Sequence, residues 1–275
     1  MNLTKMMEIW DNLAYKIYNL ISRTIYVFKY FSIHKYLKRN KILKDSHQGE
    51  RCFIVLNGPS INNYDLSKLS QEYTICTNYF YQTEYYNKIN PNYYCAVDSS
   101  FFNIKRNPEQ ELHVKNIINL NSQCKCFFNI GYMKNFELQE NVYLTYSKHM
   151  PNNGYISNNL SKLSSNFISV SLYAMNLAIY LGFKNIYILG YDFEPGKLSH
   201  FYKENSLEQK IKNNLENSIS KDEVCGRYWQ YSVAQYQNYY MRKHAEKRKV
   251  EIYNLNLNSN VRSFKFAEFD DLFTS

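Results

Sequence analysis

One turn in the sequence combines residue types that suit binding of a phosphorylated ligand. Asn57-Gly58-Pro59-Ser60 comes directly after the apolar run Cys52–Leu56. Glycine lets the backbone approach a ligand closely, proline fixes the turn, and the serine hydroxyl and backbone N–H groups can meet phosphate oxygens. The chain contains neither a P-loop nor a G-x-G-x-x-G pattern, so the turn does not indicate an ATPase or a dinucleotide-binding protein.

Three more polar residues stand directly after short apolar runs: Asn78, Asp98 and Asp192. Because the carboxyl ends of parallel strands meet at one edge of a sheet, we expect these side chains to lie at the same edge as Asn57–Ser60. No Asp-x-Asp pattern, which would supply two carboxylates to a metal ion, follows a predicted strand. The residue types therefore favour a metal-independent site. In an alternative interpretation Asp98 and Asp192 hold Mg²⁺ for a diphosphate-using enzyme.

His200 and Tyr202 are the candidates for proton transfer. Asp192 ends a predicted strand, and Pro195-Gly196 then turns the chain, which predicts that His200 returns over the carboxyl edge of the sheet. Histidine has a pKa near the working pH and suits the removal of a proton from a hydroxyl group, whereas a tyrosine hydroxyl can donate a hydrogen bond to a phosphate oxygen. In the alternative interpretation His200 is an ordinary surface histidine.

The elements that must position these residues alternate between strands and helices, which predicts an α/β fold with a Rossmann-like, mostly parallel sheet flanked by helices. Short apolar runs predict four central strands, and further runs predict weaker ones. The central set is Cys52–Leu56, Thr74–Thr77, Tyr93–Val97 and Asn185–Leu189; the weaker set is Lys115–Leu120, Lys125–Asn129, Asn141–Tyr146 and Val250–Leu255. Apolar spacing predicts helices over Ser169–Leu181, which ends at Gly182, and over Tyr231–Lys249. A polar segment near 195–230 is expected to form a lid.

The N-terminal region is basic and amphipathic. Its eight Lys and Arg residues between Lys16 and Lys44 are not interrupted by any acidic residue, and they account for nearly all of the net charge of +9. Apolar residues recur there at spacings of three and four, as in a helix with one apolar face. Such a helix suits an anionic membrane surface, although it could equally dock on the protein's own core. The basic run belongs to no recognisable nucleic-acid module, so we expect no nucleic-acid partner.

Three blocks in order resemble the bacterial glycosyltransferase family 42 sialyltransferases, which act on lipooligosaccharide. They are Arg51–Ser60 with Cys76-Thr-Asn78, the helix–strand unit from Tyr173 to Phe193, and Ile252–Ser259 with Phe264. The chain also resembles the hydroxymethylpterin pyrophosphokinase-like proteins of surface-polysaccharide loci, on Gly190-Tyr-Asp192, His200-Phe-Tyr202, and the tail from Tyr253-Asn254 to Phe273. Both families imply a Rossmann-like sheet.

The first resemblance implies roles for individual residues. It assigns nucleotide-sugar binding to nine residues: Asn57, Gly58, Pro59, Ser60, Asn78, Asp98, Asp192, Asn258 and Ser259. Asp98 departs from the family, which carries asparagine there. The family's catalytic histidine has no equivalent at its usual place, before the long helix, so His200 is the candidate base.

The resemblance implies a metal-independent transfer of sialic acid or a related nonulosonic acid from a CMP-sugar donor to a glycan acceptor on lipid or polysaccharide. A Mg-dependent pyrophosphokinase-like enzyme and a non-catalytic binding protein of polysaccharide biosynthesis are the alternatives. We expect a cytoplasmic protein, with a possible place on the inner face of the plasma membrane. Residues 1–48 are expected to form the basic helical region, and residues 49–275 the catalytic domain. The oligomeric state is not predicted.

Overall fold

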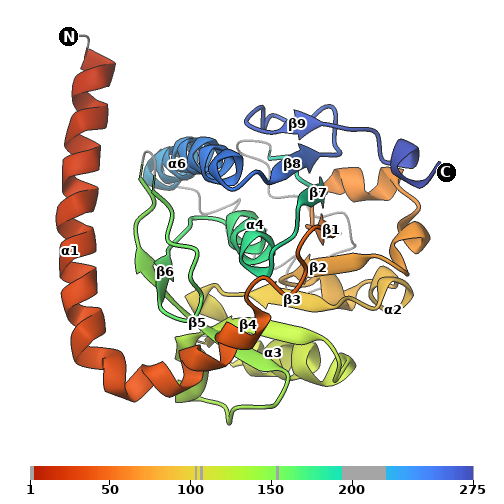
Figure 1. The fold of residues 1–275 in the computed structure, drawn as a ribbon, viewed down its shortest axis with the longest axis horizontal. Helices are drawn as coiled ribbons and strands as arrows, with labels where there is room; N and C mark the ends of the chain where they lie inside the picture. Colours follow the sequence, from red (N-terminus) through yellow and green to blue (C-terminus); the bar gives the residue numbers. More distant parts are fainter. Residues whose placement is uncertain (1–2, 103, 106–107, 153–154, 194–220, 275) are drawn as a thin grey trace.

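A nine-stranded parallel sheet forms the centre of the protein in the computed structural model, which describes residues 3–102, 104–105, 108–152, 155–193 and 221–274 (Figure 1). The strands are β1 (Arg51–Val55), β2 (Tyr73–Thr77), β3 (Tyr93–Ala96), β4 (Lys125–Asn129), β5 (Val142–His149), β6 (Leu163–Ser165), β7 (Asn185–Leu189), β8 (Glu251–Asn254) and β9 (Lys265–Phe266). Their spatial order is β6-β5-β4-β3-β2-β1-β7-β8-β9. The chain therefore runs outward from β1 to one edge, and then continues on the other side of β1.

This sheet confirms the predicted fold class, and the four strands predicted as central lie side by side as β3, β2, β1 and β7. One prediction was wrong. Lys115–Leu120 is not a strand but the end of helix α3 (Glu109–Leu120). Val114, Ile117 and Ile118 are all buried there, which is the spacing of one helical face.

Helices cover both faces of the sheet. Helices α4 (Val170–Leu181) and α6 (Lys221–Lys247) pack on one face, while α2 (Tyr85–Ile89) and α3 pack on the other. Short 3₁₀ turns complete the layers: η1 (Lys38–Leu43), η2 (Pro59–Asn63), η3 (Leu66–Leu69), η4 (Phe80–Gln82), η5 (Ser99–Phe102), η6 (Ile130–Lys134) and η7 (Asp270–Phe273). Helix α6 begins ten residues before the predicted Tyr231, and most of the predicted lid lies outside the described residues.

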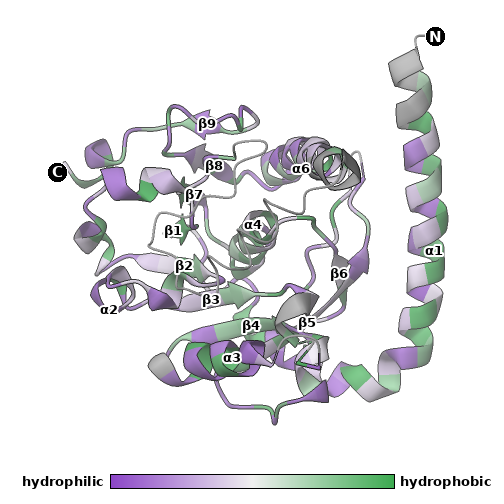
Figure 2. Cartoon of the chain, turned by 180° about the vertical axis from the view of Figure 1, so that it is seen from behind, coloured by the Kyte–Doolittle hydropathy of each residue, from purple (hydrophilic) through white to green (hydrophobic). Residues whose placement is uncertain are grey.

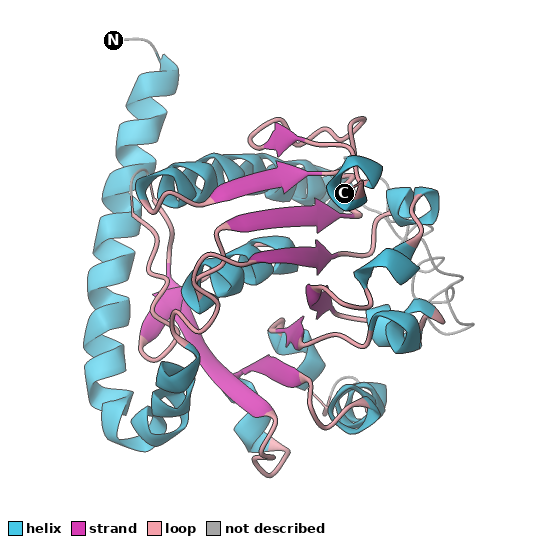
Figure 3. Cartoon of the chain, turned by 45° about the vertical axis from the view of Figure 1, so that its right-hand side comes forward, coloured by secondary structure: helices cyan, strands magenta, loops and turns pink. Residues whose placement is uncertain are grey.

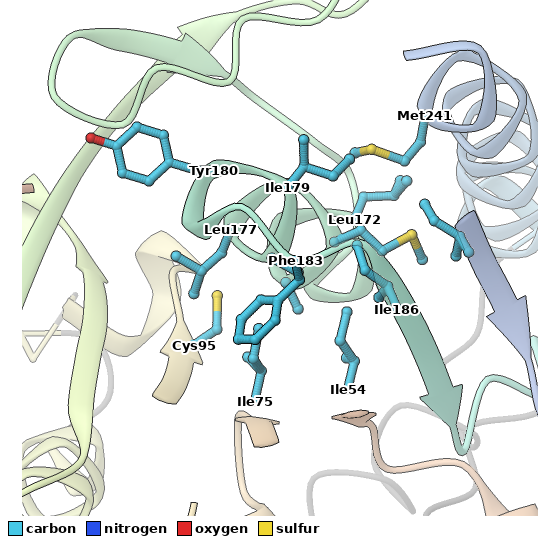
Figure 4. Close-up of a cluster of buried hydrophobic side chains, with 14 of the residues drawn as sticks. Ile54, Ile75, Cys95, Leu172, Leu177, Ile179, Tyr180, Phe183, Ile186 and Met241 are labelled. Atoms are coloured by element: carbon cyan, nitrogen blue, oxygen red, sulfur yellow. The ribbon is translucent and has the colours of Figure 1, made fainter. Parts of the chain in front are cut away.

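The core beneath α4 is continuous with the sheet. Leu172 and Leu177 of α4 are buried over Ile54 and Ile75 of the central strands, and Met241 of α6 closes the layer (Figure 4). Helix α4 ends as predicted, because Gly182 adopts a φ of 97° and its N–H donates to the carbonyls of the last turn. The chain thereby returns to the sheet as β7.

Helix α1 (Leu3–Leu37) extends along one side of the molecule (Figures 1 and 3). Its C-terminal part docks on β5 and β6, where Ile33 and Leu37 are buried against Tyr146 and Leu163. The following turn is anchored by Asn40, which is fully buried and donates two hydrogen bonds of 2.8 and 2.7 Å to carbonyl oxygens of the domain. Among the described helices none is both long and apolar enough to cross a membrane.

Candidate functional site

Four polar segments meet at the carboxyl ends of neighbouring strands. Asn57–Ser60 follows β1, Asn78 follows β2, Gly190–Asp192 follows β7 and Asn256–Ser259 follows β8. The strand order reverses between β1 and β7, and crevices at such a reversal are where open α/β sheets bind their ligands. The four strands are parallel, so the segments that follow them lie at the same edge of the sheet, as predicted.

Asp192 connects three of the four segments. Its Oδ2 accepts a 3.0 Å hydrogen bond from the backbone N–H of Ser60, and its Oδ1 accepts from the side-chain amide of Asn256. The carbonyl oxygens of Tyr191 and Asp192 accept from the hydroxyl of Ser259 at 2.6 and 3.3 Å. Both carboxylate oxygens of Asp192 thus accept hydrogen bonds from neighbouring segments and fix the positions of these segments relative to one another.

Gly58 is required because Asp192 fills the space beside it. A Cβ at Gly58 would lie far inside van der Waals distance of Oδ2 of Asp192 and of the Gly190 carbonyl oxygen. The Gly58 N–H donates to that carbonyl at 3.1 Å. The N–H groups of Gly58 and Ser60 are therefore already bonded to β7 and its following turn, so the side chains of the turn remain for a ligand. Pro59 is exposed and starts η2.

Unpaired buried atoms mark the space between β1 and β2. Oδ1 of Asn57, Oγ of Ser60, Oγ1 of Thr77 and Oδ1 of Asn78 are buried and have no hydrogen-bond partner among the described residues. The Asn57 amide donates to the Thr77 carbonyl at 3.3 Å, which turns its oxygen away from that strand end. Asn78 has a φ of 49°, a conformation that asparagine tolerates better than most residues. Unpaired buried oxygens cost about 1–3 kcal/mol each, so this arrangement favours a bound polar ligand or water.

The electrostatics of the site are set by groups around Asp192. Tyr64 donates its hydroxyl to the Leu255 carbonyl at 2.8 Å. Burial, with smaller contributions from Asp192 and Glu268, raises the pKa of Tyr64 to about 12, so its phenol stays neutral. Burial also raises the pKa of Tyr191, again to about 12. The two phenol hydroxyls are therefore neutral and already donate to Leu255 and Asn238, and the Asp192 carboxylate near them accepts two hydrogen bonds.

The remaining predicted residues have different positions. Ser259 is buried and bonded to the end of β7, whereas Asn258 and Asp98 are exposed. Asp98 follows β3, and Asp192 follows β7, which lies three strands away. At normal strand spacing the ends of these two strands are about 14 Å apart. Asp98 and Asp192 thus leave the sheet at separate strand ends, and joint binding of Mg²⁺ by the two carboxylates stays a prediction. Among the described residues no three His, Cys, Asp or Glu side chains form a metal-binding group.

His200 and Tyr202 lie outside the described residues, so their assignment stays a prediction. Thr77 and Asn256 were not predicted. The signal for Asn256 was the alternation of asparagines at 254, 256 and 258, in which Asn254 also bonds the Tyr191 carbonyl at 3.3 Å. Thr77 gave no separate signal, because it reads as the last residue of an apolar strand.

Residues 28–196 match the model of the 6-hydroxymethylpterin diphosphokinase MptE-like family, and the chain belongs to this family. The fold is similar to that of two Campylobacter jejuni sialyltransferases. CstII, in complex with the substrate analogue CMP-3FNeuAc, is 17% identical with a TM-score of 0.46, over 79% of this chain and 86% of that one. The monofunctional α-2,3-sialyltransferase Cst-I is 19% identical with a TM-score of 0.48, over 79% of each chain. No curated protein matches the sequence.

Proposed function

We propose that the chain is a glycosyltransferase that binds a CMP-sugar at the carboxyl ends of β1, β2 and β7. The observation that carries the proposal is the cluster of unpaired oxygens on Asn57, Ser60 and Asn78 at the reversal of strand order. The amide oxygens accept hydrogen bonds and suit ribose hydroxyls or an exocyclic amino group, and the serine hydroxyl can donate to a phosphate. The choice of a CMP-sugar rests on the sequence blocks that resemble the family 42 enzymes.

The proposed transfer uses the residues in separate roles. Asp192 holds the β1 turn in place, since it accepts from Ser60 N–H. His200 removes the proton of the acceptor hydroxyl, and Tyr202 donates to the departing phosphate, so the reaction does not require a metal. His200→Ala then lowers the turnover rate by about 10²–10⁴-fold and leaves nucleotide affinity nearly unchanged. Near-normal turnover in this variant would remove His200 from the proposal without touching the nucleotide site.

A ligand screen tests the nucleotide site. CMP at 100 times its dissociation constant adds about 2.7 kcal/mol of stability, which raises the melting temperature by about 5–10 °C in a protein of this size. Ser60→Ala and Asn57→Ala are expected to remove most of the shift. Asn63→Ala is the matched control, because Asn63 lies on the same 3₁₀ turn and is exposed. Equal shifts in the wild type and all three variants would place the nucleotide elsewhere.

The family match favours a second candidate, a Mg-dependent diphosphokinase. It predicts that ATP with Mg²⁺ stabilises the protein more than CMP does, and that EDTA abolishes turnover. Donor hydrolysis that is unaffected by EDTA supports the glycosyltransferase. If the protein turns over no nucleotide at all, both enzyme proposals fail, and a non-catalytic role in polysaccharide assembly remains.

We also propose that α1 binds an anionic membrane surface from the cytoplasmic side. The helix docks on the domain along one side, on which Asn19 and Ser22, and further on Ile33 and Leu37, are buried. On the opposite side it exposes large apolar residues to solvent: Trp10, Leu13, Ile17, Leu20, Ile21, Phe28 and Phe31. Figure 2 shows hydrophobic positions recurring along α1. Phe28 and Phe31 are 82% and 91% exposed. A second copy of the chain is a poorer partner, because two such helices would bring the four basic residues between Lys16 and Lys35 of each helix, with no acidic residue among them, close to one another.

Point substitutions test this better than deletion, since removing residues 1–44 would also remove the buried Leu37 and Asn40. Phe28→Ser with Phe31→Ser should lower binding to vesicles that contain anionic lipid by about ten-fold or more. Leu112→Ser is the control, because it removes a 63% exposed leucine from α3. Binding that is equal in all variants, or that does not weaken with salt, would refute the membrane proposal.

A further inference from the structure

A pocket of about 410 Å³ lies between α1 and the end of β5, far along the sheet from the nucleotide site. Figure 1 shows α1 passing alongside β5 and β6 at this place. One wall comes from the helix and the other from the segment that follows β5. Seven residues line the pocket: Lys16, Asn19, Leu20, Arg23, His149, Asn152 and Tyr155.

The pocket is positively charged. Lys16 and Arg23 are seven residues apart, so they lie on the same side of α1, separated by about 10 Å along its axis. Neither forms an ion pair with another residue in the described part of the chain. No acidic residue lines the pocket. Two uncompensated cations that border one cavity attract an anion with more than one oxygen.

His149 gives the pocket a buried hydrogen-bonding group. The side chain lines the pocket, yet the residue is only 3% exposed, and its Nδ1 has no partner among the described residues. Burial, and then the charge of Arg23, lowers the pKa of His149 to about 4. The imidazole is therefore neutral at physiological pH, and in the tautomer that carries its proton on Nδ1 it can donate that proton's hydrogen bond to an anion in the pocket.

The walls of the pocket are fixed in relation to each other. Asn19 donates to the Met150 carbonyl at 3.0 Å and accepts from the Met150 N–H at 2.7 Å. This pair of bonds joins α1 to the residue after His149 across 131 positions of sequence. The ring of Tyr155 packs edge-on against His149, with centroids 5.0 Å apart. The pocket is thus a preformed site rather than a gap beside a loose helix.

The rim identifies the kind of anion. Leu20 lines the pocket and is 67% exposed, and it also belongs to the outward apolar side of α1. A ligand whose anionic group sits between Lys16 and Arg23 would therefore run its apolar part along Ile17 and Leu20. We propose that this pocket binds the phosphate headgroup of an anionic membrane lipid. The proposal rests on the membrane association of α1 and adds a specific headgroup site to it.

Two charge-matched double variants separate a headgroup site from general electrostatic attraction. Lys16→Gln with Arg23→Gln removes two charges from the pocket, while Lys29→Gln with Lys35→Gln removes two from the same helix outside it. With vesicles of phosphatidylcholine and phosphatidic acid, the pocket variant should bind about ten-fold more weakly than the control variant. Equal losses in the two variants would overturn the headgroup site and leave general membrane attraction standing.

A soluble lipid tests the pocket without a bilayer. Dihexanoyl phosphatidic acid, below its micelle concentration, should shift the imidazole NMR signals of His149 in the wild type and not in the pocket variant. Inorganic phosphate is the comparison, and it should need at least ten-fold higher concentration for the same shift because it lacks the apolar part. If inorganic phosphate binds as tightly as the lipid, the pocket is a free-phosphate site. If neither ligand shifts the imidazole signals of His149, the proposal is wrong, even where the protein binds vesicles.

Discussion

Replacing Gly58 with alanine tests the central feature of the proposed nucleotide site, the close approach of the turn after β1 to Asp192. Gly58 has φ −74° and ψ 153°, which alanine adopts without strain. The effect of the substitution therefore comes from space alone. The new methyl group would collide with Oδ2 of Asp192 and with the Gly190 carbonyl oxygen, and the second of these is backbone that cannot turn away.

The magnitude follows from what must move. Displacing Asp192 breaks or lengthens the charge-assisted hydrogen bonds from Ser60 and Asn256, each worth about 1.5–3 kcal/mol. Partial relaxation recovers some of this loss, and overpacking adds about 1–3 kcal/mol. We expect Gly58→Ala to lower the free energy of unfolding by about 3–5 kcal/mol and the melting temperature by about 6–15 °C. Nucleotide affinity should fall as well, because Asn57 is the residue before Gly58 and the backbone N–H of Ser60 donates to the displaced Asp192.

Urea denaturation measures this loss, with Gly226→Ala as the control. Gly226 lies inside α6 with nothing within 4 Å of an added Cβ, so its replacement should stabilise the protein by about 0.5–1 kcal/mol. A double variant, Gly58→Ala with Asp192→Ala, should lose less than the sum of the two single losses, since one obstacle is gone. A Gly58→Ala protein within about 0.5 kcal/mol of the wild type would refute the packing described here.

Three further predictions concern the rest of the domain. Asn40→Ala leaves two buried carbonyl oxygens without their donor and should cost about 2–4 kcal/mol in urea denaturation; a loss below 1 kcal/mol would contradict the anchoring role. Leu172→Ala empties a fully buried position under α4 and should cost about 2–5 kcal/mol, with no change in nucleotide affinity measured by calorimetry. Burial lowers the pKa of both His149 and His244 to about 4, so the unfolded chain binds more protons between pH 6.5 and 4. The stability that these histidines contribute is complete above pH 6.5 and is lost as the pH falls toward 4, and His149→Gln should flatten this dependence in thermal melts without lipid or phosphate.

The central strands could be predicted from sequence because each is buried on both faces. The runs at β1, β2, β3 and β7 are short, apolar and bounded by turn residues, which is the signature of parallel strands. The same criterion failed at Lys115–Leu120, since six residues cannot distinguish a buried strand from the apolar side of a helix. The preceding Glu109 and Glu111 lie in the first helical turn and were the missing indication.

The position of the candidate site at the carboxyl edge of the sheet was predictable from the sequence, but the structural roles of its residues were not. Asp192 was predicted from its place after a strand, whereas its partners Ser60 and Asn256 are 132 and 64 positions away. No local pattern reveals a bond over such distances, so its structural role needed the fold. The orientation of α1 was hidden for a related reason: apolar spacing shows that one side is apolar, but not which side meets the domain.

The place of β1 in the sheet has a consequence for synthesis of the protein. Arg51 pairs with Asn185 on β7, which lies 134 positions later in the chain (185 − 51). At about 5–20 residues per second, translation of that interval takes roughly 7–27 s. Once β2 has paired with β1, the other edge of β1 presents unpaired N–H and carbonyl groups until β7 is made, and such an edge readily pairs with other chains. A nascent chain that pauses before β7 is therefore open to aggregation on the ribosome, and codon usage between residues 60 and 185 would control how long that risk lasts.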